Sequence, residues 1–201
     1  MNRFFLTAAT ILLAGAGVAK AQLPSYQPTV PTVTVTQPVV SLDKYKSDFL
    51  ASEQIQKGFP RLGASIQVIA PPSDKYNALG YVLGSTDRWV WPTKGTAASE
   101  LQEIDQLMGQ SGYRRLSTFD ATVRPGKQKA VLYATLTPDG DLATILSVAL
   151  QHADGTYSCK VGANVVIRFS QLEQLRGPTY GVPMLVYERD LLTAVPTAFA
   201  R

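Results

Sequence analysis

The chain contains one thiol and one imidazole, Cys159 and His152, among its 201 residues. A cysteine nucleophile needs a thiolate and a nearby histidine base, so thiol chemistry within one chain would have to use this pair. A turn signal at residues 153–155 separates them and could bring two hairpin strands together. A histidine beside a turn is more often solvated, and a lone strand cysteine more often a small buried hydrophobe. We favour those structural roles and keep a relocated Cys159–His152 pair as the catalytic alternative.

Other catalytic chemistries have little support. One histidine and one cysteine cannot form a structural zinc site without carboxylates or a partner chain, so we expect no metal and no cofactor. A serine nucleophile would need the same histidine, and the Gly-x-Ser-x-Gly elbow does not occur in the sequence. No glycine-rich loop carries the Lys-Ser/Thr of a phosphate-binding loop. A pair of carboxylates for glycoside hydrolysis leaves no local signature and stays open.

The two tryptophans, Trp89 and Trp91, are the best candidates for a binding surface, together with Arg88. Two residues spaced by two in an extended segment point to one side. Their rings could stack on a sugar or clamp a peptide beside the cation. Tryptophan is mostly buried in proteins, however, and the interpretation that we favour is that both rings seal the core.

The elements that must position these residues are helices first and strands later. Apolar spacing predicts helices from residue 42 to 58, from 77 to 84, and from 96 or 99 to 112, with a last short helix at 170–175. Strands are expected at 64–69, 113–118, 130–137, 143–151, 156–160 and 184–188, with turn signals joining three of them into a meander. This order predicts an α+β fold, with N-terminal helices packed on an antiparallel sheet.

The first 40 residues are predicted to be an export signal and a spacer. Residues 1–21 combine a positive start, an apolar run and a small-x-small pattern, as in a cleavable signal peptide. A membrane anchor is the weaker alternative, because the run is shorter than the roughly 20 residues that span a bilayer. We therefore expect a periplasmic or secreted chain that begins at Gln22 and has no transmembrane anchor.

Residues 22–40 contain repeated prolines and no charged residue, which predicts an extended linker. Their alternating valines and threonines could instead add a strand to a partner. A single domain over residues 41–190 would follow, with a tail at 191–201. Without Arg3 and Lys20 the 19 basic residues become 17, against 15 acidic ones. The resulting net charge of 17 − 15 = +2 is too small to indicate nucleic-acid binding. A single cysteine leaves packing, rather than an internal disulfide, to stabilise the domain.

Several stretches occur in an order that carries a resemblance. They are residues 75–84, 87–92, 129–134, 146–151 and 154–162. They resemble the opening helix, the aromatic loop, two core strands and an Asp-Gly-x-Trp-x-Ser-Lys-x-Gly segment of an uncharacterised bacterial domain family with papain-like features. That broad group includes the NlpC/P60-type cell-wall amidases. The resemblance runs from about Phe59 to Arg189 and implies a papain-like fold.

The resemblance also implies where a catalytic pair would stand. The family's helix opens Asn-Cys, and Asn77 matches its asparagine while Ala78 stands at its cysteine. Ser147 stands at its histidine. Alanine offers no nucleophile, and serine cannot replace imidazole as a base near neutral pH. The resemblance therefore implies a degenerate site, that is, a pseudoenzyme.

Together these expectations favour an exported, non-catalytic binding or accessory module of the cell envelope. Its ligand would be cell-wall glycan or peptide, or an envelope protein. One alternative is a cysteine hydrolase or amidase that uses Cys159 and His152. Another is a structural subunit of an envelope complex.

Overall fold

A computed structural model describes residues 41–191. The predicted signal peptide, the linker and residues 192–201 lie outside the described residues, so what the sequence predicts for them stays a prediction. Within residues 41–191, no helix is both long and apolar enough to cross a membrane.

A seven-stranded antiparallel sheet forms the centre of the domain, in the order β1-β6-β5-β4-β3-β7-β2. Its strands are β1 (Gln67–Ala70), β2 (Arg114–Arg115), β3 (Lys127–Leu136), β4 (Leu142–Gln151), β5 (Tyr157–Lys160), β6 (Val166–Phe169) and β7 (Val182–Asp190). The four strands β3 to β6 pair in sequence as a meander, and β7 returns to pair with the other side of β3. The sheet is open, with the short strands β1 and β2 at its two edges.

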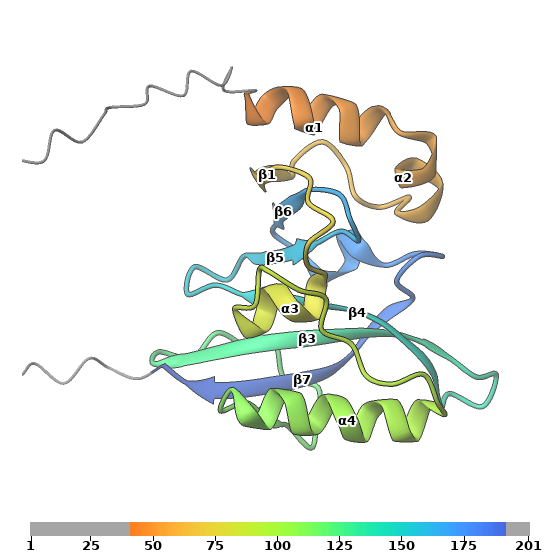
Figure 1. The fold of residues 1–201 in the computed structure, drawn as a ribbon, viewed down its shortest axis with the longest axis vertical. Coiled ribbons are helices and arrows are strands. Elements are labelled where there is room, and N and C mark those ends of the chain that lie inside the picture. The colour runs from red at the N-terminus through yellow and green to blue at the C-terminus, as the bar shows by residue number, and fades with distance from the viewer. Residues whose placement is uncertain (1–40, 192–201) are drawn as a thin grey trace, which may run out of the picture. The chain divides into compact units, whose positions relative to one another are not determined.

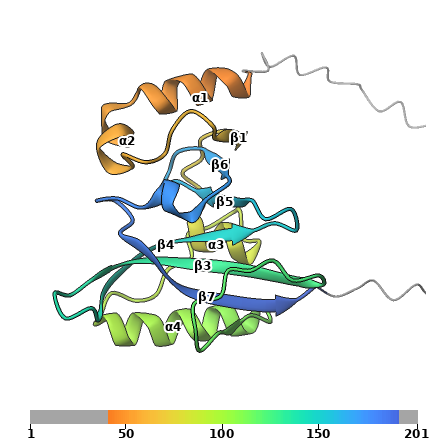
Figure 2. The ribbon, with the colours of Figure 1, turned by 180° about the vertical axis from the view of Figure 1, so that it is seen from behind.

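Helices cover this sheet. They are α1 (Leu42–Ala51), α2 (Glu53–Gly58), α3 (Ala78–Leu83), α4 (Ala97–Gln110) and the 3₁₀ helix η1 (Leu172–Leu175). Helix α1 lies beside β1, while α3 and α4 lie on one face of the strands (Figure 1). From behind, the strands stand in front of α3 (Figure 2). The predicted α+β fold, with N-terminal helices packed on an antiparallel sheet, is confirmed.

Two buried tyrosines show that the core occupies both faces of the sheet. The hydroxyl of Tyr187 donates to Asp105 in α4 at 2.8 Å, and that of Tyr133 donates to the carbonyl of Leu172 in η1 at 2.8 Å. Tyr187 pairs with Ala130 of β3, and residues 130 and 133 of a strand point to opposite sides. The face away from α3 and α4 is therefore covered by η1 and the chain around it.

Several boundaries differ from the sequence prediction for local reasons. The helix expected over 42–58 is broken at Ser52, whose backbone is extended (ψ 121°). Thr96, not Ser99, caps α4, because its hydroxyl accepts from the Ser99 amide at 3.2 Å. The expected strand at 113–118 is reduced to the two residues of β2. Strand β6 was not predicted; it has four residues, too few for a clear alternating pattern.

The residues at the two ends of α3 were sufficient to predict this helix from the sequence. Asn77 caps its start, with the side chain accepting from the Gly80 amide at 2.9 Å, and Gly84 ends it in the left-handed conformation (φ 78°). The predicted helix between these two residues is confirmed.

A buried lysine fixes the segment that leads into α3. Lys160 is 0% exposed, and its ammonium donates to the carbonyls of Ser73 (2.7 Å), Gly162 (2.7 Å) and Asn164 (2.6 Å). The ammonium also lies 5.2 Å from the ring centroid of Tyr76. Burial lowers the pKa of Lys160 to about 8, so at neutral pH the side chain is still charged and can donate all three bonds. Lys160 thereby joins the loop before α3 to the turn between β5 and β6.

Replacing Lys160 by methionine should destabilise the domain by about 3 kcal/mol, because three buried carbonyls lose their donor. Urea unfolding measured by circular dichroism gives the free energy. Lys75→Met is the matched control, since Lys75 is exposed on the same loop and should change stability by less than about 0.5 kcal/mol. Equal stability of the two variants would contradict an anchoring role for Lys160.

Candidate functional site

A cleft of about 330 Å³ opens where α3 begins beside β4. It is lined by Asn77, Ala78, Trp89, Trp91, Leu146, Ser147, Gly162 and Tyr180. We call it the tryptophan cleft. It brings together both tryptophans and all three positions of the implied degenerate site. It does not include Arg88, Cys159 or His152.

Asn77 holds the aromatic loop against α3. Besides capping the helix, its side-chain oxygen accepts from the Val90 amide at 3.3 Å, and its amide nitrogen donates to the Val90 carbonyl at 2.8 Å. Asn77 is 5% exposed. Its side chain is therefore engaged in positioning the wall of the cleft, with little left to offer a ligand.

A β-bulge shapes the opposite wall. Tyr133 of β3 faces Ser147, but the next residue, Ala134, faces Ile145, which leaves Leu146 as an extra residue in β4. In a regular strand Leu146 and Ser147 would point to opposite sides of the sheet. The bulge re-aims the strand so that both residues line the cleft.

The tryptophans are exposed rather than buried. Trp89 is 55% exposed and Trp91 is 38% exposed, so the interpretation that both rings seal the core is wrong. The neighbouring Pro92 is buried and Val90 half-buried, which indicates that the loop turns its smaller residues inward and both large rings outward. The Trp89 indole N–H donates to the carbonyl of Asp74, which ties the ring to the loop held by Lys160. Arg88, which precedes Trp89 in the sequence, is exposed.

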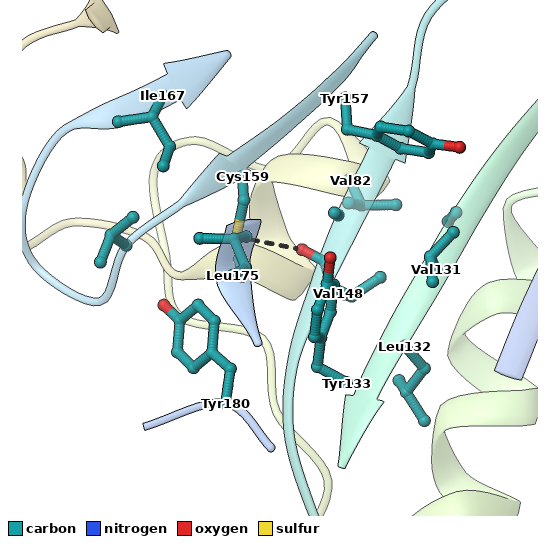
Figure 3. Packing of buried hydrophobic residues seen from close by; sticks show 14 of the residues in the cluster. Val82, Val131, Leu132, Tyr133, Val148, Tyr157, Cys159, Ile167, Leu175 and Tyr180 are labelled. Atoms are coloured by element: carbon teal, nitrogen blue, oxygen red, sulfur yellow. Dashed lines mark hydrogen bonds between the residues drawn. The ribbon is translucent and has the colours of Figure 1, made fainter. Parts of the chain in front are cut away.

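Cys159 lies inside the core. It is 0% exposed, and its sulfur lies 3.5 Å from the carbonyl oxygens of both Val148 and Lys160, either of which can accept from its one S–H group. Figure 3 shows it among apolar side chains that include Leu175 and Tyr180. Burial raises the pKa of the Cys159 thiol to about 12, so it is not a thiolate at neutral pH.

His152 lies on the other side of the sheet from this thiol. Its Nε2 is 2.8 Å from the hydroxyl oxygen of Ser158, which is in turn 2.9 Å from the Tyr81 hydroxyl in α3. Ser158 and Cys159 are neighbours in β5 and point to opposite faces. The structure therefore does not bring Cys159 and His152 together as a pair.

The contact between His152 and Ser158 was missed by sequence reasoning. It offers no nucleophile to a ligand, because Ser158 is 0% exposed. Lys160 and Tyr180 were also missed as contributors to the site. A lysine at the end of a short strand that is otherwise uncharged could have signalled a buried cation, whereas nothing local marks Tyr180.

The residues that line the tryptophan cleft are mainly apolar or aromatic. Its lining residues include no thiol, imidazole, carboxylate or amine. Across residues 41–191, no three His, Cys, Asp or Glu side chains are grouped as metal ligands. What the cleft presents is apolar and aromatic surface, the usual lining of a ligand pocket.

Residues 67–188 match the family described as Domain of unknown function (DUF7689), and the chain belongs to this family. Membership of an uncharacterised domain family is thereby confirmed. No curated protein and no solved structure matches the chain. A papain-like topology accordingly stays a prediction.

Thiol reactivity tests the placement of Cys159 and Ala78. In the chain from Gln22 to Arg201, Cys159 should react with iodoacetamide at pH 8 only upon unfolding, because it is buried and protonated. In the Ala78→Cys variant the new thiol should react in the native state faster than Cys159, because residue 78 lines the tryptophan cleft and is 5% exposed, whereas Cys159 is 0% exposed. Mass spectrometry counts the modified sites. Rapid native modification of Cys159 in the unsubstituted chain would contradict the structure.

The pH dependence of stability tests His152, the only histidine in the chain. Burial and the charge of Arg168 lower its pKa, and Asp154 partly opposes them. The folded state therefore binds this proton less readily than the unfolded state, and stability should fall as the pH drops through about 6.5 and below. His152→Gln should remove the loss between about pH 6.5 and 5, as measured by urea unfolding. The loss expected below about pH 4 from Asp120 and Asp190, whose pKa values are lowered, should remain. An unchanged profile between pH 6.5 and 5 in His152→Gln would contradict the assignment.

Proposed function

We propose that this DUF7689 domain is an exported, non-catalytic binding module of the cell envelope, and that its tryptophan cleft is the degenerate site of a papain-like fold. The observation that supports the proposal is that Ala78 and Ser147 line the same cleft. These positions were selected, through the resemblance, as those of a nucleophile and its base. They are far apart in sequence, yet they line one cleft.

The surroundings of the cleft favour binding. Trp89 and Trp91 present large exposed rings at its mouth, which costs free energy in water unless a ligand covers them. Trp89 and Asn77 are both tied to backbone groups, so the aromatic wall is held in place before a ligand arrives. Cell-wall glycan or peptide, or a segment of an envelope protein, is the proposed ligand.

The two alternatives use other parts of the molecule. A hydrolase built on Cys159 and His152 would need an accessible thiolate, and the buried thiol counts against it. A structural subunit of an envelope complex would bind through surfaces outside the cleft, and its binding would then survive changes to the cleft.

Ligand titrations of the chain from Gln22 to Arg201 test the proposal. Soluble peptidoglycan fragments and capped peptides are added while tryptophan fluorescence is followed, because the chain's two tryptophans both line the cleft. We expect a saturable change with at least one of these probes. Trp91→Ala should then weaken binding at least tenfold by calorimetry, as expected for an aromatic anchor.

Phe119→Ala is the matched control, since Phe119 is a 49% exposed aromatic residue on another loop. It should leave the affinity unchanged. Equal affinities of the Trp91 and Phe119 variants would remove the cleft from the binding site. Co-sedimentation with envelope proteins that persists in Trp91→Ala would favour the structural subunit.

A further inference from the structure

A second hollow lies where the edge strand β2 pairs with β7, at the opposite edge of the sheet from β1. It has a volume of about 350 Å³, and four of the seven residues that line it are basic: Arg114, Arg115, Lys127 and Arg189. We call it the edge hollow. One carboxylate, that of Glu188, also lines it. The edge hollow shares no lining residue with the tryptophan cleft, so the two sites are separate.

Ion pairs neutralise only half of the four cations. Within residues 41–191 the paired ones are Arg115, with Asp105 at 3.4 Å, and Lys127, with Asp190 at 2.6 Å and Glu188 at 3.8 Å. The other two, Arg114 and Arg189, have no carboxylate oxygen within 4 Å in this part of the chain. Two positive charges of the edge hollow are therefore without a counter-charge in direct contact.

The carboxylate that lines the hollow does not cancel this excess. The buried Oε2 of Glu188 lies 3.5 Å from the ammonium of Lys129, which is 1% exposed. Lys129 in turn lies 3.4 Å from Asp120, which pairs with Arg124. The connected ion pairs and the two unpaired arginines comprise six basic and four acidic side chains: Arg114, Arg115, Arg124, Lys127, Lys129 and Arg189 against Asp105, Asp120, Glu188 and Asp190. An excess of two positive charges remains.

Arg114 can offer its donors to a ligand. It is exposed, and no acceptor within residues 41–191 forms a hydrogen bond with its guanidinium group, which has five N–H donors. The pKa of Asp190 is lowered mainly by Lys127 and to a smaller extent by the charge of Arg114. Because Asp190 is held by Lys127, the Arg114 fork stays available for bidentate bonding.

Arg189 is held in place by neutral acceptors. Its Nε and Nη2 donate to Oε1 of Gln128 at 2.9 and 2.6 Å, and its Nη1 donates to the carbonyl of Ser111 at 3.2 Å. Its guanidinium carbon also lies 4.5 Å from the ring centroid of Tyr113. Each terminal nitrogen keeps one N–H for a ligand. Arg189 thus supplies a fixed cation to the hollow, while Arg114 supplies one that can adapt.

We propose that the edge hollow binds the phosphate group of a phosphate monoester. Such a group carries a charge of about −1.5 to −2 at neutral pH and has three strong acceptor oxygens. It therefore matches the excess of two positive charges, and its oxygens can accept from two guanidinium groups at once. A carboxylate, with one charge and two oxygens, would leave one arginine without a counter-charge. Because the site lies outside the tryptophan cleft, the inference is independent of the proposed function.

Calorimetry with glycerol 3-phosphate tests the inference on the chain from Gln22 to Arg201, at low ionic strength, where exposed charges are least screened. We expect saturable binding, at least tenfold tighter than that of acetate. Arg114→Gln should weaken it at least tenfold, and Arg114→Lys less, because it keeps the charge but loses the planar fork. Arg176→Gln is the matched control: it removes the same charge from an exposed side chain outside the edge hollow and should leave the affinity unchanged.

Vesicles distinguish the two sources of such a group. Co-sedimentation with phosphatidic acid vesicles, but not with phosphatidylcholine vesicles, that is lost in Arg114→Gln would assign the phosphate to a lipid headgroup. Binding of glycerol 3-phosphate without binding of these vesicles would assign it to a soluble ester.

Three results would overturn the inference. They are no binding of either phosphate probe, equal affinities for acetate and glycerol 3-phosphate, and equal weakening by Arg114→Gln and Arg176→Gln. The last result would show attraction by overall charge alone. Because none of these residues lines the tryptophan cleft, each result would leave the proposed function as it stands.

Discussion

The loop that leads into α3 and the turn after β5 are held together by one buried cation. The Lys160 ammonium has three hydrogen-bond donors and no acceptor, and each donor meets a backbone carbonyl. Two of these carbonyls belong to the turn after β5 and one to the loop that leads into α3. An apolar side chain could fill the same volume but would leave the carbonyls without partners. The cation therefore sets the distance between these two segments, which supply Asn77, Ala78 and Gly162 to the tryptophan cleft.

The two most reactive side chains of the chain lie away from the tryptophan cleft. The thiol of Cys159 is enclosed on one face of the sheet, and the imidazole of His152 is bonded to Ser158 on the other. Neither side chain lines the tryptophan cleft at the start of α3. The fold alone therefore says little about the chemistry of this cleft, which depends on the side chains that line it.

Sequence reasoning succeeded where structure is locally encoded. Asn77 and Gly84 mark the ends of α3 because capping and left-handed termination act within a few residues. It failed where the structure depends on contacts between segments that are distant in the sequence. The bulge at Leu146 depends on the register of β4 against β3, and the exposure of Trp89 and Trp91 depends on which loop residues find room in the core. Ala78 and Ser147 were found through a resemblance, whereas no pattern in the chain identified Tyr180 or the edge hollow.

The bond between Lys160 and Ser73 joins residues 87 positions apart, and β1 pairs with β6 over a similar separation. Contacts of this range form late, because a long loop must close before they gain any stability. During synthesis, α3 and the aromatic loop would leave the ribosome well before the lysine that anchors them. The loop that leads into α3 therefore gains its anchor only after residue 160 has been synthesised.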